Sequence, residues 1–234
     1  MVLVITITIA SYGLGWLIGL PWLVPFLNAA YPWWRMATEL RRGEVRRAVS
    51  VMLVWALTMG VVSTSMVAMG WSRTRGGSEL FLRASYRAEM TSWVRTGIGA
   101  ESQPLVFIPR HLGYAAVFGT AALATGGLLA MPMGAVLVNQ MGEYVGGMVA
   151  TSSHPAASAI LGWHPWAVIR IIAFVIIGVV LSAPLLSRVM KFSYALHNRR
   201  RLLQIAAALL VFDVALKWAL APAWQRILKG LAGW

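Results

Sequence analysis

Residues 113–150 read GYAAVFGTAALATGGLLAMPMGAVLVNQMGEYVGGMVA, and we expect the rest of the chain to pack around this stretch. It is apolar, rich in glycine and alanine, and carries one charged residue, Glu143. Small residues recur at four-residue intervals in two sets: Gly126, Ala130 and Gly134, and then Gly142, Gly146 and Ala150. Such spacing lines one face of a helix with small side chains, so that a second backbone can approach closely in lipid. We therefore predict that these six residues are helix-packing positions.

The composition of the whole chain indicates a membrane protein. Of its 234 residues, 59% are hydrophobic and 12% are charged, whereas a soluble domain has about 25% charged residues. Several apolar runs approach the roughly 20 residues that cross a hydrocarbon core about 30 Å thick. Backbone groups in lipid must be hydrogen-bonded internally, so these runs are predicted to be helices. We predict an all-α, polytopic transmembrane helical bundle, with residues 1–234 forming a single integral membrane domain.

About six membrane spans follow from the apolar runs and their breaks. The predicted spans are 3–27, 48–71, 112–131, 134–151, 166–187 and 202–221. The first is expected to be kinked or broken near Pro21, and a hairpin over residues 1–30 is the alternative. Residues 111–152 are too long for one span and contain Pro132, which favours two helices over one long kinked helix. The last span is expected to end before Pro222, with a short interfacial tail after it.

The polar connections between the spans suggest an orientation. Lysine and arginine number 20 against 7 acidic residues, which gives a net charge of +13. Basic residues gather in segments 35–47 and 188–201, which the positive-inside rule places in the cytoplasm, next to anionic lipids. With six spans, both termini would then lie outside. Residues 79–96 are predicted to form an amphipathic surface helix, and residues 99–110 and 152–165 to be connecting segments without a regular helix.

A polar patch interrupts the fourth predicted span. Glu143 is an ionisable residue within an apolar run, which is costly in lipid and indicates a functional site by default. Asn139 lies one turn before it, and Gln140 lies three residues before it. One interpretation is a proton or cation site that lines a pathway. The other is a helix end at the interface, or a protonated Glu143 that bonds across a helix contact.

The last predicted span carries two further charges. Asp213 and Lys217 are four residues apart, in the order that favours an ion pair within one helix. Pairing lowers the cost of placing both charges in the membrane. An alternative is that Asp213 or Glu143 pairs with Arg170 of the preceding span. The predicted polar or ion site therefore comprises Asn139, Gln140, Glu143, Arg170, Asp213 and Lys217.

The sequence carries no recognised catalytic or cofactor signature. Cysteine is absent, which excludes disulfides, thiol catalysis and thiolate metal sites. No nucleophile elbow, HExxH, P-loop or Rossmann fingerprint is present. The four histidines are His111, His154, His164 and His197. They form no HxxxH pair, and single interfacial histidines are a simpler interpretation than a metal or haem site. We expect no enzymatic activity, no metal and no cofactor.

Residues 113–188 resemble the membrane core of the stage II sporulation protein M family. The likeness lies in the glycine-rich span with its polar asparagine (ATGGLLAMPMGAVLVNQMGEYVGG). A small-residue loop follows it, then a histidine beside a proline and a glycine-containing span (WHPWAVIRIIAFVIIGVVLS). The family usually has Pro-His-Gly followed by an acidic residue, whereas this chain has His164, Pro165 and then Arg170. The resemblance implies a non-catalytic, polytopic component of a membrane complex that acts in envelope remodelling.

Two classes of function remain open from the sequence. The first is a structural or assembly subunit of a membrane complex, favoured by the small-residue spacing and the lack of catalytic motifs. The second is a small-solute or ion transporter or channel that uses intramembrane Glu143 and Asp213. Expected partners are the lipid bilayer, with anionic lipids at the basic loops, and membrane proteins in a homo- or hetero-oligomer, but no nucleic acid. The expected location is the cytoplasmic (inner) membrane of a bacterium or archaeon.

Overall fold

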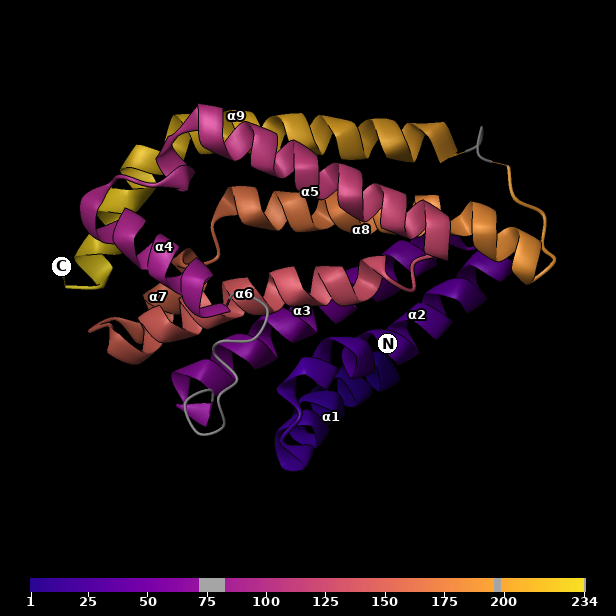
Figure 1. Cartoon of the computed structure of the whole chain (residues 1–234), viewed down its shortest axis with the longest axis horizontal. Helices are drawn as coiled ribbons and strands as arrows, with labels where there is room; N and C mark the ends of the chain where they lie inside the picture. Colours follow the sequence, from indigo (N-terminus) through magenta and orange to yellow (C-terminus); the bar gives the residue numbers. More distant parts are fainter. Residues whose placement is uncertain (72–82, 196–198, 234) are drawn as a thin grey trace.

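The computed structural model describes residues 1–71, 83–195 and 199–233, and the regular elements in these ranges are all helices (Figure 1). Three of them are long and apolar enough to cross a membrane: α3 (Val45–Ala68), α8 (Pro165–Val189) and α9 (Arg200–Leu231). The predicted all-helical class is confirmed for this part of the chain, and the three apolar helices are consistent with an integral membrane protein. Length and composition support three spans here rather than the six predicted.

The N-terminal apolar segment forms a hairpin where the sequence predicted the single span 3–27. Helix α1 (Val2–Ile18) ends at Gly19, whose φ of 73° lies in the left-handed region that glycine adopts at little cost. A short 3-10 helix, η1 (Pro21–Leu23), then turns the chain into α2 (Val24–Arg41), which packs back along α1. The break falls near Pro21 as expected, and the structure adopts the hairpin alternative (Figure 1).

The segment that follows α3 is helical over most of its described length. Helix α4 (Arg83–Thr96) overlaps the amphipathic helix predicted over 79–96, of which residues 79–82 lie outside the described residues. The prediction of an irregular segment over 99–110 is wrong. A 3-10 turn, η4 (Ala100–Ser102), leads almost directly into α5 (Pro104–Thr125). The first residue of α5 is a proline, and the first position of a helix does not need a backbone N–H donor.

Two helices occupy the glycine-rich stretch, as the length of that stretch predicted. Helix α5 is followed by a turn at Gly126 and Gly127, whose φ values are 59° and 89°. A side chain would strain both residues, so glycine permits the reversal into α6 (Ala130–Thr151).

The segment after α6 and the end of the last helix differ from the prediction. The segment 152–165 contains a short helix, α7 (Pro155–Leu161), between α6 and α8. Helix α9 continues through Pro222 to Leu231, so the predicted end before Pro222 is wrong. Neighbouring helices in a membrane protein can satisfy the backbone carbonyl that an internal proline leaves without a donor.

The bundle has two ends of different character. The C-terminal ends of α2 and α8 lie at one end, together with the first turns of α3 and α9 (Figure 1). Basic residues of segments 35–47 and 188–201 are concentrated at that end. The other end carries α4, α7 and the C-terminal part of α9 (Figure 1). Between the ends, α3 packs along α6, and α8 packs along both α5 and α9.

Helix α6 meets α3 through two of the six predicted packing residues. A Cβ atom on Gly146 would lie 2.6 Å from the carbonyl oxygen of Thr64, and one on Gly142 would lie 2.7 Å from the Cβ atom of Ser63. Real Cβ atoms do not approach other atoms so closely, so the contact requires glycine.

The other four small residues have different surroundings. Ala130 is buried, and a Cβ atom on Gly134 would make an ordinary contact of 3.5 Å with Phe118 of α5. Gly126 caps α5 and does not belong to α6, so it does not share a helical face with Ala130 and Gly134. Ala150 is exposed near the end of α6. The four-residue spacing therefore does not describe one continuous packing face, because the chain turns at Gly126.

We expect Gly146→Leu to destabilise the protein by about 2–3 kcal/mol, because the added side chain must push α6 away from the backbone of α3. Thermal unfolding of the purified protein in detergent measures this loss. The matched control is Gly113→Leu in α5, where an added Cβ atom has no neighbour within 4 Å among the described residues. A Gly146→Leu variant as stable as the control would contradict the close contact.

Candidate functional site

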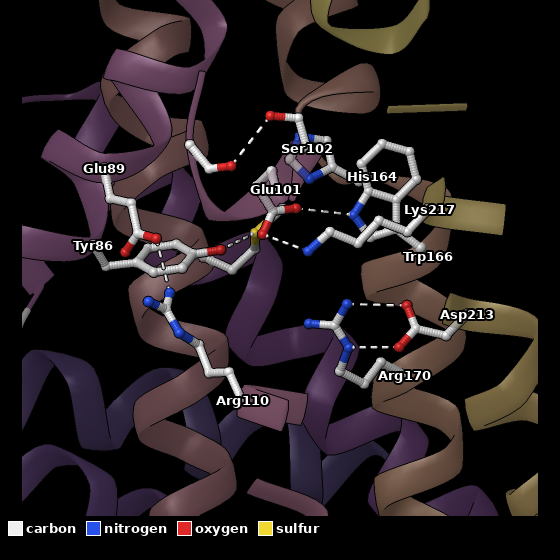
Figure 2. A network of polar contacts seen from close by, with 12 residues as sticks. Tyr86, Glu89, Glu101, Ser102, Arg110, His164, Trp166, Arg170, Asp213 and Lys217 are labelled. Carbon is white, nitrogen blue, oxygen red and sulfur yellow. Dashed lines mark hydrogen bonds and ion pairs between the residues drawn. The ribbon is translucent and has the colours of Figure 1, made fainter. Parts of the chain in front are cut away.

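Arg170 and Asp213 form a buried ion pair between α8 and α9 (Figure 2). The guanidinium donates two parallel hydrogen bonds, from Nε to Oδ2 at 2.8 Å and from Nη2 to Oδ1 at 2.9 Å. Asp213 is 1% exposed. Two-point pairing of this kind fixes the geometry and neutralises both charges. The ion pair of Asp213 is therefore with the neighbouring helix, rather than with Lys217 one turn later in α9.

Lys217 pairs with a residue that the sequence analysis missed. Its Nζ atom donates to Oε1 of Glu101, in η4, at 2.7 Å, and the indole N–H of Trp166 donates to Oε2 at 3.2 Å. Lys217 is 0% exposed, and its ammonium lies 4.3 Å from the ring centroid of Phe107, within the range of cation–π attraction. The carboxylate and the ring together compensate the burial of this charge.

Glu101 was missed because it lies in segment 99–110, which was predicted to lack regular structure. One signal could have found it. The chain has only 7 acidic residues against 20 basic ones, so any acidic residue close to the predicted spans is a candidate partner for a buried base. The sequence spacing could not identify that base, since Lys217 lies more than a hundred residues away.

The charge state of Glu101 follows from its surroundings. Burial is the largest single influence and by itself would raise the pKa of the carboxyl, but the charge and hydrogen bond of Lys217, together with smaller effects of His164 and Arg170, outweigh burial and lower the pKa from 4.5 to about 2. A folded-state pKa below the unfolded value stabilises the protein above the unfolded pKa. That stability is lost as the pH falls from about 4.5 toward 2. Glu101 is therefore ionised throughout the neutral range.

The polar patch predicted around Glu143 lies on α6. Glu143 is buried on α6, and its Oε1 atom lies 3.4 Å from Nη1 of Arg87 in α4. Asn139 accepts a hydrogen bond of 2.5 Å from the hydroxyl of Tyr12 in α1. Gln140 faces the cavity described next. These three residues of one helix thus have three different sets of neighbours.

A cavity of about 380 Å³ lies among α2, α3, α5, α6 and α8. Small-molecule sites typically measure about 300–1,000 Å³ and are mostly apolar with a few polar groups. The apolar body of this cavity is lined by side chains that include Met36, Met52, Trp55, Met59, Met131 and Phe174. Toward α4 the lining becomes polar, with Tyr86, Glu89, Glu101, Arg110, His111 and Arg170. The cavity is therefore amphipathic along its length.

Two partly exposed side chains, one from α4 and one from α5, line the polar end of the cavity. Glu89 of α4 and Arg110 of α5 form an ion pair of 2.8 Å, and both side chains are partly exposed. The hydroxyl of Tyr86 donates to the sulfur of Met141 at 3.4 Å. Burial raises the pKa of Tyr86 well above its usual value, so the group remains a hydrogen-bond donor. Figure 2 shows the guanidinium nitrogen of Arg170 that Asp213 does not use, pointing away from that carboxylate toward Arg110.

The histidines do not assemble into a metal centre in the part of the chain that the structure covers. His164 is buried, and its ring centroid lies 4.8 Å from that of Trp166 and 5.5 Å from that of Trp93. Among the described residues, no group of three or more His, Asp or Glu side chains could hold a metal ion. His197 lies outside the described residues.

Comparison with known proteins finds no relative: no family model, no curated protein and no solved structure matches the chain.

We expect Glu101→Gln to destabilise the protein by about 3–5 kcal/mol, because it leaves the Lys217 charge buried without a partner. The double variant Glu101→Gln/Lys217→Met removes both charges and should recover most of that loss. Thermal unfolding in detergent at neutral pH measures both.

The matched control for this prediction is the partly exposed pair at the mouth of the cavity. Glu89→Gln should cost less than about 1 kcal/mol, because solvent screens the charge that remains on Arg110. Equal losses for Glu101→Gln and Glu89→Gln would show that the Lys217–Glu101 pair does not have the energetic role assigned to it.

Proposed function

We propose that this chain is a multi-pass membrane protein that binds and transports a small amphipathic molecule through the cavity among α3, α5, α6 and α8. One observation carries the proposal: the cavity has an apolar body inside the bundle and a charged end beside α4, where two of the lining side chains are partly exposed. A molecule with an apolar part and a polar part would match both. The role is non-enzymatic, and it requires no cofactor.

The side chains of the cavity body suit a ligand that must enter and leave. Met36, Met52, Met59 and Met131 all line it. Methionine is unbranched, flexible and polarizable, so a methionine-rich surface adapts to an irregular apolar partner. Entry would occur at the polar end, where Arg110 and Glu89 are partly exposed.

In this proposal the bundle lies in a cytoplasmic (inner) membrane with its basic end in the cytoplasm, following the positive-inside rule. Helices α5 and α6 cross the membrane beside α3, α8 and α9. The α1–α2 hairpin takes the place of the first predicted span, so the N-terminus lies in the cytoplasm and not outside. Helix α4 then lies at the outer surface, which is where the cavity opens.

A path for a free ion along Glu143 and Asp213 has less support than the cavity. Asp213 is held by two hydrogen bonds from Arg170, and Glu143 lies within 3.4 Å of Arg87. A paired carboxylate is already neutralised, so it attracts a passing cation weakly. We therefore assign both carboxylates a structural role in joining helices.

A structural or assembly subunit of a membrane complex is the second candidate. Only 17% of the apolar stretch of α9 is buried within the chain, against 44% for α3. Large side chains such as Phe212 and Trp218 are exposed on α9, so this helix offers a surface to lipid or to another membrane protein. The resemblance to the stage II sporulation protein M family would agree with this candidate.

We expect Ala56→Phe to abolish binding of the cavity ligand, because Ala56 lines the cavity and a phenyl ring there would fill part of it. Molecules that co-purify with the wild type and the variant would be extracted and compared by mass spectrometry. The control is Leu57→Phe, which adds an aromatic ring at the next residue, where the side chain is 69% exposed.

The same preparations separate the two candidate functions. Loss of a bound molecule in Ala56→Phe but not in Leu57→Phe supports binding in the cavity. A stoichiometric protein partner, with no small molecule that depends on Ala56, would instead favour the subunit.

A further inference from the structure

The polar end of the cavity holds as many acidic as basic groups. Three ion pairs surround it: Glu89–Arg110, Glu101–Lys217 and Asp213–Arg170. Their formal charges cancel. A ligand with a net charge would bring an uncompensated charge into a partly buried site, which is unfavourable. A ligand whose own charges cancel avoids that cost.

Hydrogen-bond donors nevertheless remain available at this end. Both carboxylate oxygens of Asp213 and both of Glu101 already accept hydrogen bonds. Arg170 directs its third guanidinium nitrogen away from Asp213, and Arg110 donates to Glu89 through Nη1 (Figure 2). A guanidinium has five N–H donors in a planar arrangement that matches phosphate oxygens. The two arginines therefore favour a phosphate group.

Glu89 supplies the opposite charge at the mouth. One of its oxygens, Oε1, accepts from Arg110 at 2.8 Å, and the side chain is partly exposed. A carboxylate can accept hydrogen bonds on both oxygens. An ammonium group of the ligand could therefore bind Glu89 while the phosphate binds the arginines.

The body of the cavity would surround the apolar part of the ligand. Its methionine-rich lining, with Met36, Met52, Met59 and Met131, would contact an acyl chain.

We propose that the cavity binds a zwitterionic, single-chain phospholipid. Its phosphate contacts Arg170 and Arg110, its ammonium contacts Glu89, and its acyl chain lies along the methionine-rich body. The volume of about 380 Å³ is near the lower limit of small-molecule sites, which favours one chain over two. This inference rests on the proposed function, to which it adds the class of ligand.

The test compares three probes with the same acyl chain on the delipidated full-length protein. Lysophosphatidylethanolamine is zwitterionic, lysophosphatidic acid is anionic, and monoacylglycerol has neither phosphate nor charge. Binding is measured by native mass spectrometry from detergent. We expect the zwitterionic probe to bind at least about tenfold more tightly than either of the others, because it alone satisfies the arginines and keeps the site neutral.

Two variants of the mouth pair test the placement of the charges. Glu89→Gln leaves an excess positive charge, and it should shift the preference by about tenfold toward lysophosphatidic acid. Arg110→Gln should weaken both phosphate-bearing probes by about tenfold and leave monoacylglycerol unchanged. Both positions are partly exposed, and thermal unfolding checks that each variant remains folded.

The outcomes separate this inference from the proposed function. If lysophosphatidic acid or monoacylglycerol binds as tightly as the zwitterion, the ligand class is overturned and a cavity ligand remains. Unchanged selectivity in both mouth variants also overturns it. If Ala56→Phe reduces the binding of none of the probes and of no co-purified molecule, the proposed function itself fails.

Discussion

The burial of charge on α9 is the constraint on which the arrangement of the second half of the chain depends. Asp213 and Lys217 lie one turn apart on a helix that is apolar enough to cross a membrane. Leaving either charge unpaired there would cost several kcal/mol. Each has a partner on a different element, Arg170 on α8 and Glu101 in η4. The Arg170–Asp213 pair fixes the position of α9 along α8, and the Lys217–Glu101 pair holds η4 against α9.

The same pairs make the amphipathic cavity chemically reasonable. An apolar chamber beside unpaired charges would be unstable, because the charges would draw in water or lose their ionisation. In this chain each carboxylate oxygen of Asp213 and Glu101 accepts a hydrogen bond from a neighbouring side chain. Arg170 retains a nitrogen that faces the other way (Figure 2). The polar end of the cavity can therefore have no net charge and still offer a hydrogen-bond donor, the free nitrogen of Arg170, to a ligand.

Apolar runs determine most of the fold, and they could be identified from the sequence. The helices follow because a backbone in lipid has no other hydrogen-bond partners, and the reversal near Pro21 was signalled by nearby glycines and prolines. Two features could not be predicted from the sequence, because they depend on contacts between segments that are distant in the chain: the role of each proline and the partners of the buried charges. Proline marks the start of α5 at Pro104 and lies inside α9 at Pro222, and the residue type alone does not separate these roles. Pairs such as Lys217 with Glu101 join segments far apart in the chain, so no local spacing predicts them.

The packing of α6 on α3 connects the small residues of the glycine-rich stretch to the cavity. The two helices lie side by side and run in the same direction (Figure 1). At Gly142 and Gly146 their backbones nearly touch, which excludes any ligand. One to three turns earlier, the two helices carry flexible methionines, Met52 and Met59 on α3 and Met131 on α6, and these line the cavity. Glycine at one end of the interface thus holds the helices together, while long side chains at the other end leave a deformable space between them. The rigid glycine contact keeps α3 and α6 together, and the flexible methionines beside it can rearrange around a ligand. A ligand could therefore enter the cavity without separating the two helices.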